Sequence, residues 1–196
     1  MLKYIVFTFL FLSNFCLAES LSNNELNKIE KYLNNIHTAE AEFIQLNHDG
    51  TLSEGIFYLK KPGKFRWQYN DQPIIVIANG KSLIYYDTEL EQSNYIPIEN
   101  SIAALITRKK IKFNSDLEVI KSIKTEGAML ITAKKSKQKD IGEFTFVFSI
   151  EPFELKKIEL TDVNKQKVSV NFINFLVNPS KKISDDLFSV KDSRFK

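Results

Sequence analysis

Residues 55–69 read GIFYLKKPGKFRWQY, and this stretch predicts two β strands joined by a tight turn. Apolar residues fill most of the first arm, and Lys-Pro-Gly at residues 61–63 supplies the turn, because proline and glycine favour turn backbone angles. In the second arm Phe65, Trp67 and Tyr69 alternate with polar residues, as in a strand that buries one face. The only tryptophan of the chain therefore lies in the second strand of a hairpin.

The segments on both sides continue this pattern of short strands. A second hairpin follows at once, and its tip holds Asn79-Gly80, a dipeptide typical of two-residue hairpin turns. Consecutive strands with short connections pair antiparallel. The sequence predicts about 11 strands, at residues 39–46, 55–60, 65–69, 74–78, 83–87, 93–96, 117–124, 129–133, 143–150, 155–161 and 168–175.

Two short helices are predicted beside the strands. Ser22 and Glu25 form a capping box ahead of apolar residues spaced three and four apart, which predicts an amphipathic helix at residues 23–36. A second helix is predicted to end near Thr107, because a capping residue at 100 or 101 precedes apolar residues with helical spacing.

The start of the chain has the pattern of a secretory signal peptide. Lys3 precedes a short apolar run, and small residues stand three and one before a cut after Ala18. The run is shorter than the roughly 20 residues that span a bilayer, and an uncleaved anchor is the alternative. We therefore expect a signal peptide at residues 1–18 and a single domain at residues 19–196.

Cys16 is the only cysteine, and it raises the question of lipidation. A lipid-bearing cysteine needs a small residue just before it and an aliphatic residue three before, but Phe15 and Ser13 stand there. The signal peptide thus removes the only cysteine. An exported chain without disulfides must rely on its apolar core for stability.

Composition and motifs favour a binding protein over an enzyme. The net charge of +3, from 27 basic and 24 acidic residues, is too small to indicate nucleic-acid binding. His37 and His48 are the only histidines, and no nucleophile elbow, phosphate loop or dinucleotide fingerprint is present. Two histidines without a cysteine make no recognisable metal site. We expect no catalytic residue, metal or cofactor; an esterase-like enzyme is the less favoured alternative.

Two strands carry more apolar surface than a half-buried sheet requires. Residues 56–59 and 74–77 are apolar on both faces. One curved sheet with an inner face of aromatic rings, covered by the two helices, would satisfy this pattern and could enclose a cavity. The same rings could instead form a filled core, where aromatic side chains are usually found. Composition alone does not separate these two possibilities.

The central stretch resembles the outer-membrane lipoprotein carrier family, LolA. Support outside it comes from Ala41-x-Phe43-x-Gln45 and Asp186-Leu187-Phe188. The matching pieces of the central stretch are Gly55-x-Phe57-x-Leu59, Lys61-Pro62-Gly63-x-Phe65-Arg66-Trp67-x-Tyr69, Pro73, Asn79-Gly80-Lys81, Tyr85-Tyr86-Asp87 and Glu91-Gln92.

The resemblance implies a mainly β fold, an incomplete antiparallel β barrel of about 11 strands with short α helices as a lid. It implies a periplasmic carrier, expected to be a monomer, that binds acylated lipoproteins in an apolar cavity. Such a carrier takes its cargo from an inner-membrane ABC transporter and hands it to an outer-membrane receptor. A periplasmic sensor of the same fold, or a carrier of another lipid, is the alternative.

The resemblance also directs attention to particular residues. In family members an arginine before the motif proline hydrogen-bonds the lid shut; here that residue is Lys61, which offers a point charge without a planar fork. Lys61 and Arg66 are expected at the latch or rim, although Lys61 could also be a solvated turn residue. The residues expected to line the lipid cavity are Leu33, Ile36, Phe43, Phe57, Phe65, Trp67, Ile102, Leu105 and Ile106.

Overall fold

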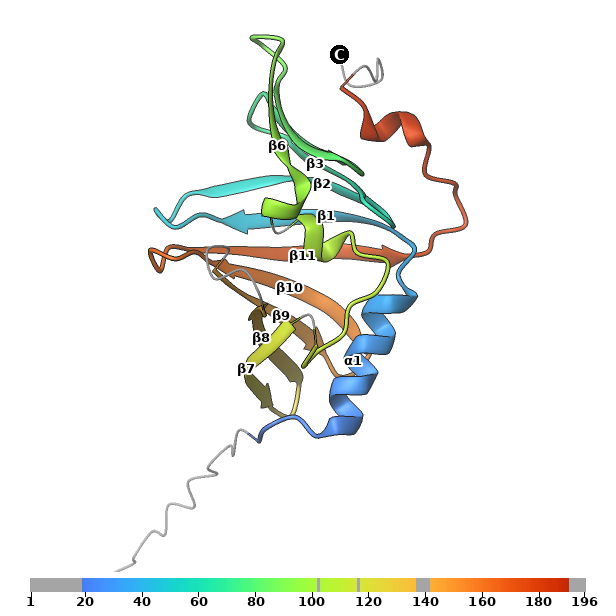
Figure 1. Cartoon of the computed structure of the whole chain (residues 1–196), viewed down its shortest axis with the longest axis vertical. Helices are drawn as coiled ribbons and strands as arrows, with labels where there is room; N and C mark the ends of the chain where they lie inside the picture. The colour runs from blue at the N-terminus through green and yellow to red at the C-terminus, as the bar shows by residue number, and fades with distance from the viewer. Residues whose placement is uncertain (1–18, 102, 116, 137–141, 191–196) are drawn as a thin grey trace, which may run out of the picture.

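The computed structural model describes residues 19–101, 103–115, 117–136 and 142–190. The signal peptide predicted at residues 1–18 and the cavity residue Ile102 lie outside the described residues and stay predictions. Within the described part, one antiparallel sheet of 11 strands runs in the order β6-β5-β4-β3-β2-β1-β11-β10-β9-β8-β7 (Figure 1). Its end strands β6 and β7 do not pair with each other, so the barrel is incomplete. The predicted fold class is confirmed.

The elements follow the chain in a simple order. Strands that follow each other in sequence pair with each other, except β6 and β7. The first and last strands, β1 and β11, pair in the middle of the sheet. The elements are α1 (Asn23–Asn35), β1 (Thr38–Leu46), β2 (Leu52–Lys60), β3 (Lys64–Tyr69), β4 (Ile74–Asn79), β5 (Ser82–Asp87), β6 (Gln92–Pro97), the 3-10 helix η1 (Ile98–Asn100), α2 (Ala103–Ile106), β7 (Leu117–Lys124), β8 (Ala128–Lys135), β9 (Glu143–Ser149), β10 (Glu154–Thr161), β11 (Lys167–Val177) and η3 (Asp185–Phe188).

Helix α1 begins at the predicted capping box. The Glu25 amide donates to the Ser22 hydroxyl, and the Ser22 amide donates to a Glu25 carboxylate oxygen at 2.8 Å. The helix ends at Asn35, where a side chain from beyond β11 takes over: Asn178 Nδ2 donates to the Asn35 carbonyl at 2.8 Å. Its Oδ1 accepts from the amide of His37 at 2.9 Å. Both ends of α1 are therefore fixed.

The second predicted helix is shorter than expected. The segment splits into η1 and the four-residue α2. Ser101, which was expected to cap the helix, donates its hydroxyl instead to the Ile98 carbonyl at 2.7 Å and so closes η1. The Thr107 hydroxyl likewise donates back to the Ala103 carbonyl at 2.6 Å and ends α2.

The sheet buries both of its faces over β2–β5, for different reasons. We call the side under α1 and α2 the inner face; it contributes most of the main core, with Phe43, Phe57 and Phe65 among its members. On the outer face a second core joins the sheet to the C-terminal segment (Figure 1). This second core explains why these strands are apolar on both sides; its buried members are Ile75, Ile77, Ile84, Ile183, Leu187 and Phe188.

Gly55 in β2 is required by close packing on the inner face. It stands opposite Phe43 of β1 and Tyr69 of β3. A Cβ atom at this position would lie 2.0 Å from the Gln68 carbonyl oxygen and 2.6 Å from the Phe43 ring. The Phe43 ring thus covers the space that a side chain would occupy.

We predict that Gly55→Ala lowers the free energy of unfolding by about 3 kcal/mol or more, since overpacking costs about 1–3 kcal/mol and here a backbone oxygen must also move. Gly127→Ala is the matched control, because nothing lies within 4 Å of its added Cβ. The control should change stability by less than about 1 kcal/mol. Urea unfolding measures both; equal values for the two variants would contradict the packing described for Gly55.

Candidate functional site

An aromatic wall covers the middle of the inner face. Neighbouring strands place Phe43, Phe57, Trp67 and Phe172 against one another, with ring centroids 4.2 Å apart for Phe43 and Trp67. The Phe57 ring lies 5.2 Å from Trp67 and 5.6 Å from Phe172. Aromatic pairs at these separations pack favourably beyond the area they bury. The wall is therefore a rigid surface at the centre of the sheet.

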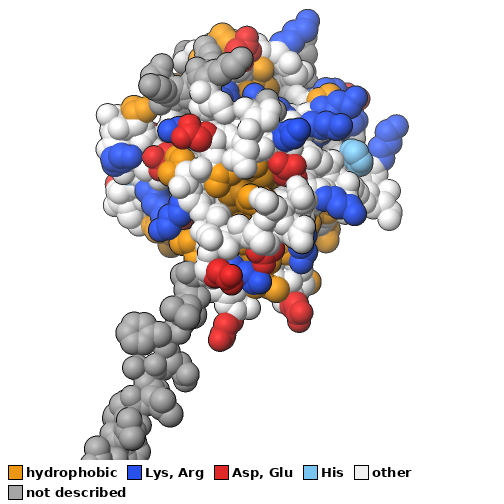
Figure 2. All heavy atoms as spheres, turned by 60° about the horizontal axis from the view of Figure 1, so that its bottom comes forward, with side chains coloured by type: hydrophobic (Ala, Val, Ile, Leu, Met, Phe, Trp, Pro, Cys, Tyr) orange, Lys and Arg blue, Asp and Glu red, His pale blue; other side chains and the backbone are white. Residues whose placement is uncertain are grey.

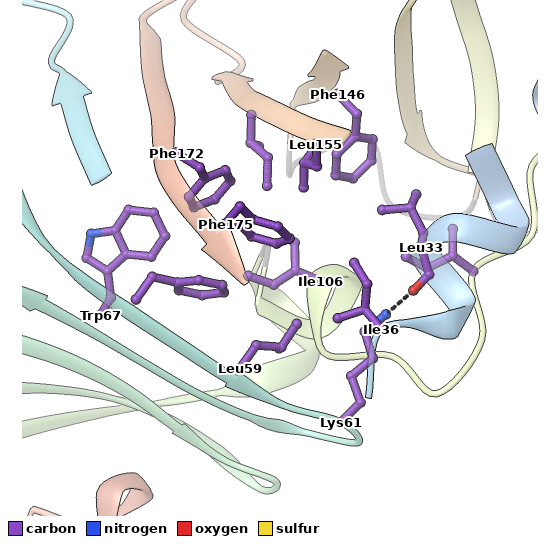
Figure 3. A pocket seen from close by; sticks show the side chains of 13 residues that line it. Leu33, Ile36, Leu59, Lys61, Trp67, Ile106, Phe146, Leu155, Phe172 and Phe175 are labelled. Carbon is purple, nitrogen blue, oxygen red and sulfur yellow. Dashed lines mark hydrogen bonds between the residues drawn. The ribbon is translucent and has the colours of Figure 1, made fainter. Parts of the chain in front are cut away.

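Two apolar cavities lie between this wall and the helices. The smaller cavity is about 40 Å³ and the larger about 200 Å³. Trp67, Ile106 and Ile158 line both, so these three side chains separate the two spaces. The smaller cavity, drawn in Figure 3, is lined in addition by Leu33, Ile36, Phe57, Leu59, Lys61, Ile111, Phe146, Leu155, Phe172 and Phe175. The larger is lined in addition by Gln45, Phe65, Tyr69, Val76, Leu83, Tyr85, Ala103, Leu160, Val168 and Val170.

Most of the residues expected at the cavity come together there. Those that line one or both cavities are Leu33, Ile36, Phe57, Phe65, Trp67 and Ile106. Phe43 and Leu105 are fully buried in the core and line neither of these two cavities. Sequence reasoning missed the contribution of β9–β11, including Phe146 and Phe172. The alternating phenylalanines of those strands were the available signal, but their position opposite α1 depends on the curvature of the sheet.

The turn at residues 61–63 joins the sheet to both helices. Lys61 Nζ donates to the Leu33 carbonyl in α1 at 2.8 Å (Figure 3). The Lys61 amide donates to the His37 carbonyl just beyond α1 at 2.8 Å, and the Gly63 amide donates to the Thr107 carbonyl at the end of α2 at 2.9 Å. We call this segment the latch turn. It holds the lid, formed by α1, η1 and α2, through the bonds to Leu33 and Thr107, while the bond to His37 extends the pairing of β1 with β2.

Burial alters the charge chemistry of Lys61. Its ammonium group lies at the edge of an otherwise apolar cavity, and its hydrogen-bond partner is a neutral carbonyl. Desolvation disfavours the charged form and lowers the pKa of Lys61 from 10.5 to about 8. Lys61 is therefore not a solvated turn residue; its charge is held in a place that is unfavourable for it.

A second lysine ties the lid to the far half of the sheet. Lys135 ends β8, and its Nζ donates to the Glu99 carbonyl of η1 at 2.8 Å. Burial lowers the pKa of Lys135 as well. The Lys135 side chain is therefore buried rather than solvated.

The two helices are also joined to each other. Asn34 of α1 makes a pair of hydrogen bonds with Ile111, which follows α2: Nδ2 donates to the carbonyl at 2.9 Å, and Oδ1 accepts from the amide at 2.7 Å. Glu30 accepts from the Phe113 amide at 2.6 Å. The lid is therefore connected across its two parts as well as to the sheet.

Arg66 does not lie at the rim of either cavity, and that prediction is wrong. It alternates with Phe65 and Trp67 and so points to the outer face, where it is 1% exposed. Its Nη1 donates to the Leu187 carbonyl of η3 at 3.1 Å, and its Nε donates to Gln68 Oε1 at 3.0 Å. Arg66 fixes the C-terminal segment on the sheet rather than the lid.

Figure 2 shows one face on which apolar side chains gather centrally while basic and acidic side chains are interspersed around them.

Over the part of the chain that the structure describes, no helix combines the length and apolar character needed to cross a membrane. The same residues contain no cluster of three or more His, Cys, Asp or Glu placed to hold a metal ion.

Comparison with known proteins finds a matching family and similar sequences. Residues 34–191 match the family described as Outer membrane lipoprotein carrier protein LolA. An outer-membrane lipoprotein carrier protein of Legionella pneumophila (strain Paris) is 28% identical over 183 residues, covering 88% of each chain. An uncharacterized protein of Rickettsia prowazekii is 27% identical over 184 residues, covering 91% of this chain and 84% of that protein.

Two solved structures share the fold of this chain. An uncharacterized conserved protein of Thermus thermophilus has a TM-score of 0.53 at 10% identity, covering 88% of this chain and 96% of that chain. A DUF1329 family protein of Desulfovibrio piger has a TM-score of 0.53 at 7% identity, covering 85% and 95%. At such low identity these two structures show the shared architecture alone.

The lowered pKa of Lys61 predicts a pH dependence of stability. Between its folded value of about 8 and its ordinary value of 10.5, the unfolded chain binds more protons than the folded chain. Stability contributed by this group therefore rises with pH across that window. We expect the wild type to gain about 1–3 kcal/mol relative to Lys61→Met between pH 8 and pH 10.5.

Urea unfolding of both proteins at several pH values measures this difference. The variant keeps the other titratable groups, so their contributions cancel in the comparison. A difference that stays flat or falls as the pH rises would contradict the burial of a charged Lys61 at the latch turn.

Proposed function

This chain belongs to the LolA family of outer-membrane lipoprotein carrier proteins, and from that premise we propose that it carries lipoproteins across the periplasm with their acyl chains in its apolar cavities. The cargo would come from an inner-membrane ABC transporter and pass to an outer-membrane receptor. The proposal includes export by the predicted signal peptide and action as a monomer without catalytic activity. The observation that carries it is an apolar space under a hydrogen-bonded lid.

The energetics of the cargo explain the need for such a space. Each methylene kept out of water is worth about 0.8 kcal/mol, so several long acyl chains would cost tens of kcal/mol if exposed. A carrier must therefore offer an apolar wall of comparable area, and it must hide that wall when empty. The aromatic wall beneath the lid is the candidate for this surface.

The cavities of the closed molecule are too small for a whole triacylated lipoprotein. An apolar protein cavity of about 150 Å³ holds one benzene molecule. The larger cavity, at about 200 Å³, therefore admits only part of one long acyl chain. Loading must separate the lid from the sheet, which means breaking the hydrogen bonds of the latch turn.

The latch turn is weak enough for cargo to open it. A typical hydrogen bond contributes about 0.5–1.5 kcal/mol net, so the two bonds to Leu33 and Thr107 together contribute about 1–3 kcal/mol. Burial of a few methylenes offsets that amount. Release of the cargo then needs no nucleotide chemistry in the carrier, because the closed lid re-forms the same bonds.

Ile106 offers a direct test, because it lines both cavities and is only partly buried. In Ile106→Glu the carboxylate can reach water in the free protein, but bound acyl chains would have to desolvate it. We expect this variant to release at least about tenfold less triacylated lipoprotein from inner-membrane vesicles that contain the transporter and ATP, since tenfold requires only 1.4 kcal/mol.

Leu90→Glu is the matched control. It makes the same chemical change at a residue that is 66% exposed and lies outside both cavities. The control should release as much lipoprotein as the wild type, and thermal unfolding should show both variants folded. Wild-type release by Ile106→Glu would show that acyl chains bind elsewhere, and no release by the wild type would refute the proposed function.

A further inference from the structure

Trp67 carries a polar group that the folded protein leaves unused. Among the described residues, its Nε1 is the one buried side-chain nitrogen or oxygen without a hydrogen-bond partner. The indole N–H is a donor only, and buried polar groups nearly always find partners. In Figure 3 this nitrogen lies on the side of the ring away from the other labelled side chains of the smaller cavity. The Trp67 ring also lines the larger cavity, but Nε1 itself is buried in the closed form, so a ligand reaches it only when the closed form rearranges during loading.

Two polar side chains that line the larger cavity, Tyr69 and Gln45, belong to a chain of hydrogen bonds. The Tyr69 hydroxyl donates to Gln45 Oε1 at 3.1 Å, and Gln45 Nε2 donates to Asn47 Oδ1 at 2.6 Å. Burial raises the pKa of Tyr69, and Gln45 and Trp67 lower it in part. Trp67 is thus a neighbour of the Tyr69 hydroxyl, but no hydrogen bond of normal geometry joins the two. Gln45 and Tyr69 therefore give the larger cavity a polar corner, next to a buried indole N–H that has no partner of its own.

The walls of this cavity determine which acceptor can bind there. None of its lining residues is charged, and Lys61 lines only the smaller cavity. A carboxylate or phosphate bound in this corner would therefore be buried without a cation, which is strongly unfavourable. A neutral oxygen next to an apolar chain fits both the donor and the walls. On an acylated ligand that oxygen is the carbonyl of the acyl ester or amide.

We propose that Trp67 Nε1 and the adjacent Tyr69–Gln45 pair form a carbonyl subsite for the ester or amide group of a bound acyl chain. The inference rests on the proposed function and adds to it a fixed position for the linkage end of one chain. The hydrocarbon then extends along the apolar walls, and the linkage does not slide deeper into the cavity. A hydrogen bond to the indole replaces the water that the carbonyl loses on entry.

The single tryptophan makes the subsite directly observable. The chain gives one indole N–H signal in a two-dimensional proton–nitrogen NMR spectrum. The probes are decanoyl glycerol, which carries an ester, N-decanoyl ethanolamine, which carries an amide, and decyl glycerol ether, which has no carbonyl. We expect a carbonyl probe to move the indole proton downfield and to bind roughly two- to tenfold more tightly than the ether, the range that one net hydrogen bond supplies.

Two variants separate the hydrogen bond from packing. Trp67→Phe keeps an aromatic ring and removes the donor, so calorimetry should show the preference for the carbonyl probe falling to about one. Phe65→Leu changes an apolar wall of the same cavity, so it should weaken carbonyl and ether probes by the same factor and keep the preference.

Each outcome bears on the proposal. A response to the ester or to the amide alone supports the subsite and identifies its linkage. If the ester, amide and ether bind the wild type equally and leave the indole signal alike, the subsite is wrong while acyl-chain binding stands. If no probe binds the wild type, both the subsite and the proposed function fail. The NMR result on the wild type decides the matter even where Trp67→Phe folds poorly.

Discussion

The latch turn is the interaction on which the closed form of this protein depends. An open sheet with an aromatic inner face exposes that face to water unless something covers it, and here the lid packs over it. The latch turn bonds to the carbonyls of Leu33 and Thr107, and Lys135 of β8 adds a bond to η1. Because one short turn contacts both helices, a change at this point reaches the whole lid. These bonds help to keep the lid over both cavities.

With lysine instead of arginine at the latch turn, different hydrogen bonds hold the lid closed. A guanidinium could hold several carbonyls with one planar fork, whereas the Lys61 ammonium bonds to the carbonyl of Leu33 alone. The backbone amide of Gly63 supplies the bond to Thr107. The lid is thus held by one side chain and by the backbone of the turn. Desolvation of the ammonium, seen in its lowered pKa, makes the closed form less favourable and so assists opening.

Local patterns in the sequence were sufficient for most of the fold. The capping box at Ser22, the hairpin at residues 55–69 and the number of strands all follow from short-range chemistry. Long-range packing was not accessible in the same way. The outer core depends on Leu187 and its neighbours folding back over β3–β5, and no local pattern specifies that contact. Arg66 was assigned to the rim although its alternation with Trp67 placed it on the opposite face. The size of the cavities depends on curvature, which the sequence pattern does not encode.

We propose that the closed lid covers an apolar space that receives the acyl chains of a lipoprotein. The decisive measurement is native mass spectrometry of the protein isolated from the periplasm of cells depleted of the outer-membrane receptor, because cargo cannot leave there. We expect a complex of one chain with one acylated lipoprotein. A chain carrying only phospholipid, or no ligand at all, would contradict it.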